Sequence, residues 1–182
     1  MRITAITLSA IAALWACTSA PAATEPVAQD TAVSDMVSLS AQTVVSPDGQ
    51  ISVTLQSVEG TPTWSVSLGD ETIISPSPLG FRFLETDSLD TGLVLVSAET
   101  HSADKTWEQP WGEQRIMREH YEELLVRFAD TGISERYFDI RVRVFDDGVG
   151  FRYEVPQLTA DGKISIIDEL TEFRVDDGAT AW

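Results

Sequence analysis

The stretch YFDIRVRVFDDGVGFRYEV, residues 137–155, decides the fold of this chain. In its first half every second side chain, from Phe138 to Val144, is apolar, and the side chains between them are Asp or Arg. Asp146-Asp147-Gly148 is a turn signal, and after it apolar residues alternate again with Gly, Arg and Glu. A period of two places one set of side chains in a core and the other in water. The stretch therefore predicts an antiparallel β-hairpin with one buried face.

Shorter segments of the same kind precede and follow this hairpin, and turn residues separate them at intervals of roughly ten residues. One such turn is the SPDG sequence at residues 46–49, where Pro presets φ and Gly accepts a positive φ. This spacing is typical of an antiparallel β-sandwich and not of βαβ units. We therefore predict an all-β fold, an antiparallel sandwich. The candidate strands are residues 51–55, 64–68, 71–74, 79–84, 93–98, 124–128, 164–167 and 173–175.

Two segments contain residues that are uncommon in strands. Pro76 and Pro78 have no backbone N–H to donate to a ladder, so we expect the strand that starts at Glu71 to end before them. Residues 114–123 are rich in helix formers but lie between candidate strands, and we predict that they are extended.

The amino terminus carries the features of an export signal. Arg2 precedes an apolar run at residues 3–16 that is too short to span a bilayer as a stable helix. The run ends in LWAC, which resembles a bacterial lipobox with Cys17 as the lipidated residue, although Trp15 is bulkier than usual there. Ordinary cleavage at the small-x-small pattern of residues 20–22 is the alternative. We expect an exported protein, either periplasmic or an outer-membrane-anchored lipoprotein.

Composition excludes several classes of function. The chain has 182 residues and a formal net charge of −17, a field that repels nucleic acid and anionic lipid, so a membrane contact is expected only through a lipid anchor. A single cysteine can form neither an internal disulfide nor a cysteine-rich zinc site. The sequence stops four residues after the turn signal at residues 176–178, on the apolar Trp182. We therefore expect a truncated chain, with a sandwich that is incomplete at its C-terminus.

Six short segments occur in an order and spacing that resemble the amino-terminal domain of glycoside hydrolase family 97. Each segment alone is a common turn or strand fragment, and their joint register over residues 44–182 carries the resemblance. They are Ser46-Pro47-Asp48-Gly49, Ser77-Pro78-Leu79-Gly80, Trp111-Gly112-Glu113, His120-Tyr121-Glu122-Glu123-Leu124, FDDGVGFRY at residues 145–153, and Thr180-Ala181-Trp182.

The resemblance implies a galactose-mutarotase-like super-sandwich from an exported, exo-acting α-glycosidase of the α-glucosidase or α-galactosidase type. It implies that a catalytic (β/α)₈ barrel, absent from this chain, binds the oligosaccharide and that calcium assists the full-length enzyme. No catalytic or metal residue of the family matches a position here, so we expect no cofactor in this fragment and no hydrolysis by it alone. The expected organisation is a signal peptide with lipobox at 1–17, a flexible tether at 18–43 and the sandwich at 44–182.

Residues 107–121 are the segment most suited to touch sugar. Aromatic faces stack on pyranose rings, and carboxylates and imidazole hydrogen-bond hydroxyls. On this ground we predict Trp107, Trp111, Glu113 and His120 as substrate-binding residues. Tryptophan serves more often as packing, so contact with the core or with the missing barrel stays open as an interpretation.

Two other functions stay open. A free-standing carbohydrate-binding lipoprotein without hydrolase activity would use the aromatic segment alone. A mutarotase would need a paired His and Glu, and only His101 and His120 are available. For Asp146 and Asp147 a turn is the favoured role over a catalytic pair, because Asp hydrogen-bonds its own backbone before a glycine.

Overall fold

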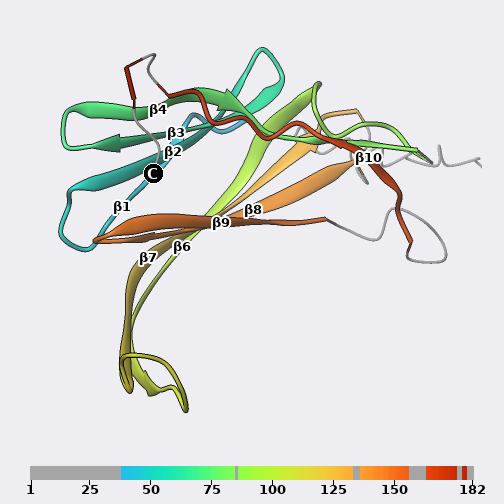
Figure 1. The fold of residues 1–182 in the computed structure, drawn as a ribbon. Helices are drawn as coiled ribbons and strands as arrows, with labels where there is room; N and C mark the ends of the chain where they lie inside the picture. The colour runs from blue at the N-terminus through green and yellow to red at the C-terminus, as the bar shows by residue number, and fades with distance from the viewer. Residues whose placement is uncertain (1–37, 85, 133–135, 156–162, 176–177, 180–182) are drawn as a thin grey trace, which may run out of the picture. The chain divides into compact units, whose positions relative to one another are not determined.

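The computed structural model describes residues 38–84, 86–132, 136–155, 163–175 and 178–179, and the predicted leader with Cys17 lies outside them. The described residues contain no helix, and hence none that is long and apolar enough to span a membrane. Within these ranges ten strands form antiparallel ladders, which confirms the prediction of an all-β antiparallel sandwich (Figure 1). The strands are β1 (Gln42–Val45), β2 (Ile51–Val58), β3 (Thr61–Leu68), β4 (Glu71–Pro78), β5 (Phe81–Phe83), β6 (Leu93–Glu108), β7 (Ile116–Asp130), β8 (Tyr137–Phe145), β9 (Gly148–Glu154) and β10 (Ile166–Glu169).

The strands make two four-stranded meanders and one short pair. The first sheet has the order β1-β2-β3-β4, the second has the order β6-β7-β8-β9, and β5 pairs with β10. The two meanders pack face to face through contacts of β2 with β6 and β8, of β3 with β6 and of β1 with β7. Connections this short favour neighbouring antiparallel strands, so the order follows from the sequence of turns.

The core lies between the two sheets and is built from the apolar side chains that the period of two predicted. Phe128 and Phe138 are fully buried, and their ring centroids lie 5.6 Å apart. Tyr153 continues the aromatic stack to Phe138 at 5.6 Å and to Phe81 at 4.4 Å, which joins the second sheet to β5. Burial of several large aromatic side chains dominates the stability of such a sandwich.

The hairpin of β8 and β9 has the predicted bounds almost to the residue. Phe145 pairs with Gly148 across a two-residue turn, and Asp139 pairs with Glu154 at the other end. The turn role assigned to Asp146 agrees with its contacts, because its Oδ1 accepts a hydrogen bond of 2.9 Å from the backbone N–H of Asp48. This bond ties the β8–β9 turn to the β1–β2 turn of the opposite sheet.

The prediction that β4 ends before Pro76 is wrong. β4 runs through both prolines to Pro78 because it is the edge strand of its sheet, where a residue without an N–H can face away from the neighbouring strand. A later segment covers that edge: the N–H of Ser75 donates to the carbonyl of Arg174 at 2.8 Å, and the N–H of Glu172 donates to that of Pro78 at 3.1 Å.

Two further strand ends differ from the prediction. β6 continues ten residues beyond Ala98 to Glu108, and a bulge between Leu95 and Ser97 shifts its register on β7. β1 begins at Gln42, two residues inside the segment that we assigned to the tether. Residues 116–123 are extended as predicted, because they form the first half of β7.

The face of the second sheet that points away from the core carries paired charges. The carboxylate of Glu123, with only 6% of its side chain exposed, accepts hydrogen bonds from Arg141 at 2.5 Å and from Arg143 at 2.7 Å. Glu154 accepts from Arg141 at 2.7 Å and from Arg152 at 2.8 Å. These arginines lower the pKa of Glu154 to about 2. Cross-strand ion pairs thus hold three strands in register on this face.

Candidate functional site

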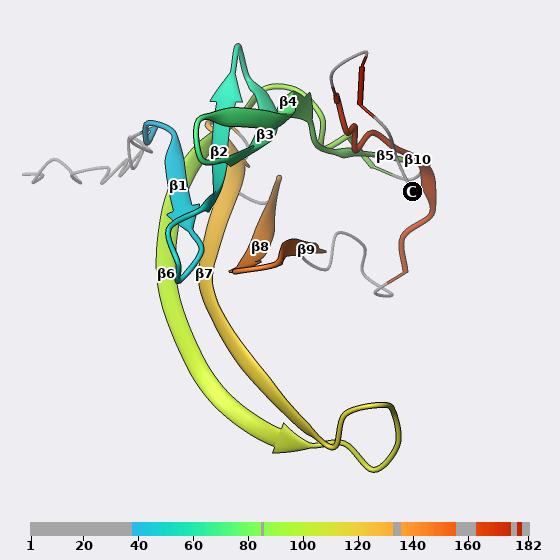
Figure 2. The same ribbon diagram turned by 60° about the vertical axis from the view of Figure 1, so that its left-hand side comes forward.

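The second sheet extends into a two-stranded arm. β8 pairs with β7 only over Glu122–Ala129, whereas β6 pairs with β7 as far as Glu108 and Ile116. In the described part of the chain residues 103–121 therefore form a ribbon that has no third strand, and Figure 2 shows it curving away from the two sheets. A lone hairpin is only marginally stable in water, so the arm depends on its own side-chain contacts or on a partner.

A loop with internal hydrogen bonds closes the end of this arm. The N–H of Gln109 donates to the carbonyl of Arg115 at 2.9 Å, and the Gln109 side chain donates to the carbonyl of Gln114 at 2.6 Å. Gly112 has a φ of +122°, and a Cβ there would lie 2.5 Å from the Gln109 amide nitrogen. A side chain at this φ would be strained, so glycine is favoured at this position of the loop.

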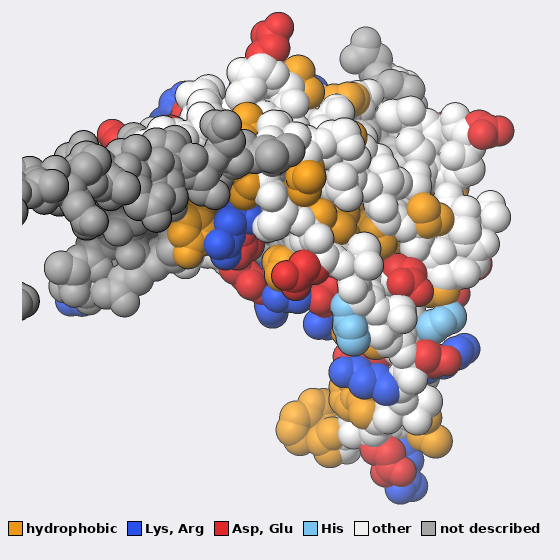
Figure 3. Space-filling model, turned by 180° about the vertical axis from the view of Figure 1, so that it is seen from behind, with side chains coloured by type: hydrophobic (Ala, Val, Ile, Leu, Met, Phe, Trp, Pro, Cys, Tyr) orange, Lys and Arg blue, Asp and Glu red, His pale blue; other side chains and the backbone are white. Residues whose placement is uncertain are grey.

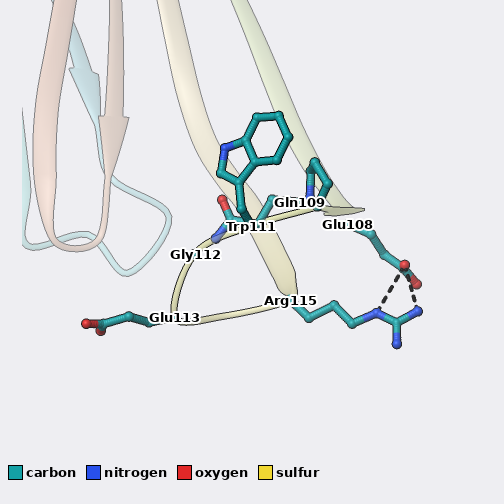
Figure 4. A pocket seen from close by; sticks show the side chains of 7 residues that line it. Glu108, Gln109, Trp111, Gly112, Glu113 and Arg115 are labelled. Atoms are coloured by element: carbon teal, nitrogen blue, oxygen red, sulfur yellow. Dashed lines mark hydrogen bonds and ion pairs between the residues drawn. The ribbon is translucent and has the colours of Figure 1, made fainter.

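The loop surrounds an open hollow of about 510 Å³. The indole of Trp111 stands up from the loop, Glu113 points away on one side, and Arg115 pairs with Glu108 on the other (Figure 4). The lining residues are Glu108, Gln109, Pro110, Trp111, Gly112, Glu113 and Arg115.

The four predicted site residues do not form one cluster. Trp111, 82% exposed, and Glu113 both line the hollow. Trp107 lies on one face of the ribbon, opposite Met117, and does not line it. His120 lies nearer to the base of the arm, where its Nδ1 is 3.9 Å from Oδ2 of Asp146.

Three polar residues that were not among the predicted substrate-binding residues belong to this site. Glu108, Gln109 and Arg115 line the hollow together with the predicted pair. The ion pair of Glu108 with Arg115, at 3.0 Å, joins residues seven apart in the sequence. A signal was present, since opposite charges that flank a Pro- and Gly-containing loop between strands are expected to meet across it.

The charged residues along the arm are paired within it. Arg118 donates two hydrogen bonds of 2.7 Å to Asp104 and thereby lowers the pKa of that carboxyl. A hydrogen bond and an ion pair with Glu119, at 2.9 Å, raise the pKa of Lys105. The arm is therefore close to electrically neutral, in contrast to the chain as a whole.

The hollow presents groups that can contact a ligand. Glycoside hydrolysis needs two carboxyl groups that flank the scissile bond in a cleft, one of them commonly kept protonated by burial. Here Glu113 is exposed on the loop, and Glu108 is held by Arg115. An indole face with an amide, a guanidinium and a carboxylate around it suits either a sugar ring or a protein surface.

Calcium, which the resemblance implies for the full-length enzyme, finds no fitting site here. Within the described ranges no group of three or more His, Cys, Asp and Glu residues is placed to hold a metal ion.

Comparison with known proteins gives one consistent family. The family model described as "Glycosyl-hydrolase 97 N-terminal" matches residues 44–182. The chain is 35% identical over 133 residues to a probable retaining alpha-galactosidase of Streptomyces bingchenggensis, covering 73% of this chain and 20% of that protein. It is 26% identical to a retaining alpha-galactosidase of Bacteroides thetaiotaomicron, covering 64% of this chain and 17% of that protein.

Solved structures agree with the sequence matches. A glycoside hydrolase family 97 enzyme from Pseudoalteromonas in complex with panose superposes with a TM-score of 0.70 at 36% identity, over 75% of this chain and 20% of that one. A beta-arabinopyranosidase superposes with a TM-score of 0.65 at 25% identity, over 74% of this chain and 21% of that one. The chain thus spans about 20% of the length of these relatives. By its sequence over residues 44–182 and by its fold, the chain belongs to the glycosyl-hydrolase 97 N-terminal family.

Proposed function

We propose that this chain is the N-terminal scaffold domain of an exported, exo-acting α-glycosidase whose catalytic barrel belongs to a further part of the same polypeptide. The observation that carries the proposal is the family match over residues 44–182 in a chain that spans 20% of the length of its glycosidase relatives. The described residues also favour catalysis by another domain, because the arm's carboxylates are exposed or held in ion pairs within the arm.

The role of the sandwich is to hold a neighbouring domain and to present the arm to it. The two meanders share one aromatic core, so the base of the arm is fixed on the sandwich. The tip carries Trp111 and Glu113 on a loop that is closed by hydrogen bonds of Gln109, and we expect these two residues to form a wall element beside an oligosaccharide in the barrel. Preorganised side chains of this kind bind at a low entropic cost.

The substrate class we propose is an α-linked galactoside or glucoside. The two curated relatives named above are retaining alpha-galactosidases, and the Pseudoalteromonas enzyme was solved with panose. Calcium dependence of the full-length enzyme is part of the proposal, with ligands drawn from other parts of the polypeptide.

The test is a deletion in the intact glycosidase. We expect the intact protein to release nitrophenol from nitrophenyl α-galactoside or α-glucoside, and the variant that lacks residues 44–182 to lose this activity. Full activity of the deletion variant would contradict the scaffold role.

Export and anchoring are proposed from the leader and Cys17. Substitution Cys17→Ser should move the protein from the membrane fraction to the soluble periplasmic fraction and abolish incorporation of labelled palmitate. An unchanged distribution would favour ordinary cleavage near residues 20–22 instead.

A free-standing carbohydrate-binding lipoprotein is the second candidate function, and one observation favours it. The indole of Trp111 is 82% exposed on the loop at the end of the arm, and an exposed aromatic face is what a sugar-binding platform needs. Titration of the 182-residue chain with panose, followed by tryptophan fluorescence, tests this function, with Trp111→Ala as the control. Binding that disappears in the variant, together with a gene that encodes no barrel, would favour it over the scaffold.

A further inference from the structure

The apolar side chains at the end of the arm point to both of its faces. Residues directly opposite in a ladder share a face, and the face alternates along the strand. Trp107, opposite Met117, lies on one face, and Ile116, opposite Glu108, lies on the other. Trp107 is 44% exposed and Ile116 is 63% exposed.

Figure 3 shows hydrophobic side chains on either side of the arm's end, beyond the band of charged side chains. Trp111 and Pro110 add apolar side chains in the loop, beside the exposed ion pair of Glu108 with Arg115. A ribbon that rests on a partner with one face would keep polar residues on the other. Exposed apolar side chains on both faces are the pattern of an element that is covered on both sides.

The charged side chains next to the tip also suit a position that is covered on both faces. Asp104 with Arg118 is one pair, and Lys105 with Glu119 is a second pair on the opposite face. A charge that is already paired and hydrogen-bonded loses less on removal from water than a free charge does. Each face of the ribbon thus combines an exposed apolar residue with a neutralised ion pair.

We propose that the end of the arm, residues 107–117, inserts into a cleft of the remaining polypeptide of the intact glycosidase and is covered on both faces. The occupant is the rest of the same protein because the chain spans only 20% of the length of its relatives, so that the larger part of such an enzyme is available as a partner. Glu113, exposed on the loop, then meets a positively charged or hydrogen-donating group inside the cleft. The inference rests on the proposed function and adds how the sandwich contacts the rest of the glycosidase.

The first experiment is hydroxyl-radical footprinting of the intact glycosidase, with each residue's oxidation rate divided by its rate in the denatured protein. The chain offers matched references, since Trp64 is 4% exposed and Ile140 is 1% exposed in the core. Insertion predicts that Trp107 is protected like Trp64 and that Ile116 is protected like Ile140. Protection of one face alone would overturn the inference in favour of an arm that lies flat on a surface. Oxidation of both at rates that match their exposure in this structure would overturn it as well.

The second experiment uses one polar substitution on each face. Trp107→Gln and Ile116→Gln should each lower the equilibrium constant for folding of the intact enzyme by about tenfold or more, because each removes a buried apolar side chain. The control variants are His101→Gln, on the face of Trp107, and Thr106→Gln, on the face of Ile116; both residues are exposed and polar and should change little. An effect of only one of the two test variants would contradict coverage on both faces.

Hydrolysis of the nitrophenyl glycosides is measured on the same wild-type preparation. A protected arm in a protein without glycosidase activity would refute the proposed function and keep the insertion. An active enzyme with an unprotected arm would refute the insertion and keep the proposed function.

Discussion

The buried carboxylate of Glu123 is the contact on the outer face of the second sheet whose removal should cost most. It accepts one charge-assisted hydrogen bond from Arg141 at 2.5 Å and one from Arg143 at 2.7 Å, and its side chain is 6% exposed. The substitution Glu123→Gln keeps the shape and removes the charge. It leaves two guanidinium groups beside a neutral amide that donates where an acceptor is needed.

The magnitude follows from the exposure of the two arginines. Breaking a fully buried ion pair costs about 3–5 kcal/mol, because the remaining charge has no compensation. Here the side chain of Arg141 is 23% exposed and that of Arg143 is 40% exposed, and Arg141 keeps its second partner, Glu154. Water and Glu154 therefore recover part of the loss, and we expect a destabilisation of about 2–3 kcal/mol.

The assay is urea denaturation of the 182-residue chain followed by near-ultraviolet circular dichroism. With a urea slope of about 2 kcal/mol per molar, the midpoint should fall by about 1–1.5 M. Glu122→Gln is the matched control, because the neighbouring residue points to the opposite face of β7 and is partly exposed. Its midpoint should move by less than about 0.3 M, which corresponds to the usual effect of a surface substitution.

The pH dependence gives an independent check. Burial raises the pKa of Glu123, but the hydrogen bonds from Arg143 and Arg141 outweigh it, and the pKa lies below its ordinary value of 4.5. A carboxyl with a lowered pKa stabilises the fold above its ordinary pKa and loses this contribution as the pH falls through the lowered value. The difference between wild type and Glu123→Gln should therefore shrink in acid. A midpoint change for Glu123→Gln no larger than that for Glu122→Gln at neutral pH would refute the reasoning.

Three further predictions concern the same fold. Because Arg141 and then Arg152 lower the pKa of Glu154 to about 2, its stabilising contribution should be complete above pH 4.5 and decline toward pH 2, as urea midpoints across that range would show. Gly80→Ala should destabilise the chain by about 3 kcal/mol or prevent folding, because a Cβ would lie 2.4 Å from a backbone oxygen at a φ of +151°; a melting temperature within 2 °C of wild type, about 0.5 kcal/mol, would contradict this. Ser46→Ala should cost about 1–2 kcal/mol in urea, because the buried hydroxyl bonds two backbone N–H groups and Asp48, and an unchanged midpoint would exclude that role.

Most of the sandwich was predictable because one face of each strand is buried. The alternation from Phe138 to Val144 and the turn before Gly148 fixed the β8–β9 hairpin, since register and core face follow from the same pattern. The path of β4 through Pro76 was not predictable in the same way. Tolerance of proline depends on whether the strand is an edge strand, and that is a property of the assembled sheet.

The arm was only partly predictable, for a related reason. Beyond Ala98 neither face of β6 is buried by the described sandwich, so the apolar alternation that marks a strand is lost. Two of the residues that were predicted from the composition of the segment, Trp111 and Glu113, line the same hollow at the tip. The composition could not show that His120 lies apart from these two residues. Its position along the arm depends on how far β6 and β7 stay paired.

The most direct test of the central claim is the rate of nitrophenol release from nitrophenyl α-galactoside and α-glucoside by the 182-residue chain alone, beside the intact glycosidase at the same molar concentration. A scaffold domain predicts no release above the buffer rate for the chain alone and clear release for the intact protein. Release by the chain alone, abolished by Glu113→Gln, would contradict the assignment of catalysis to another domain.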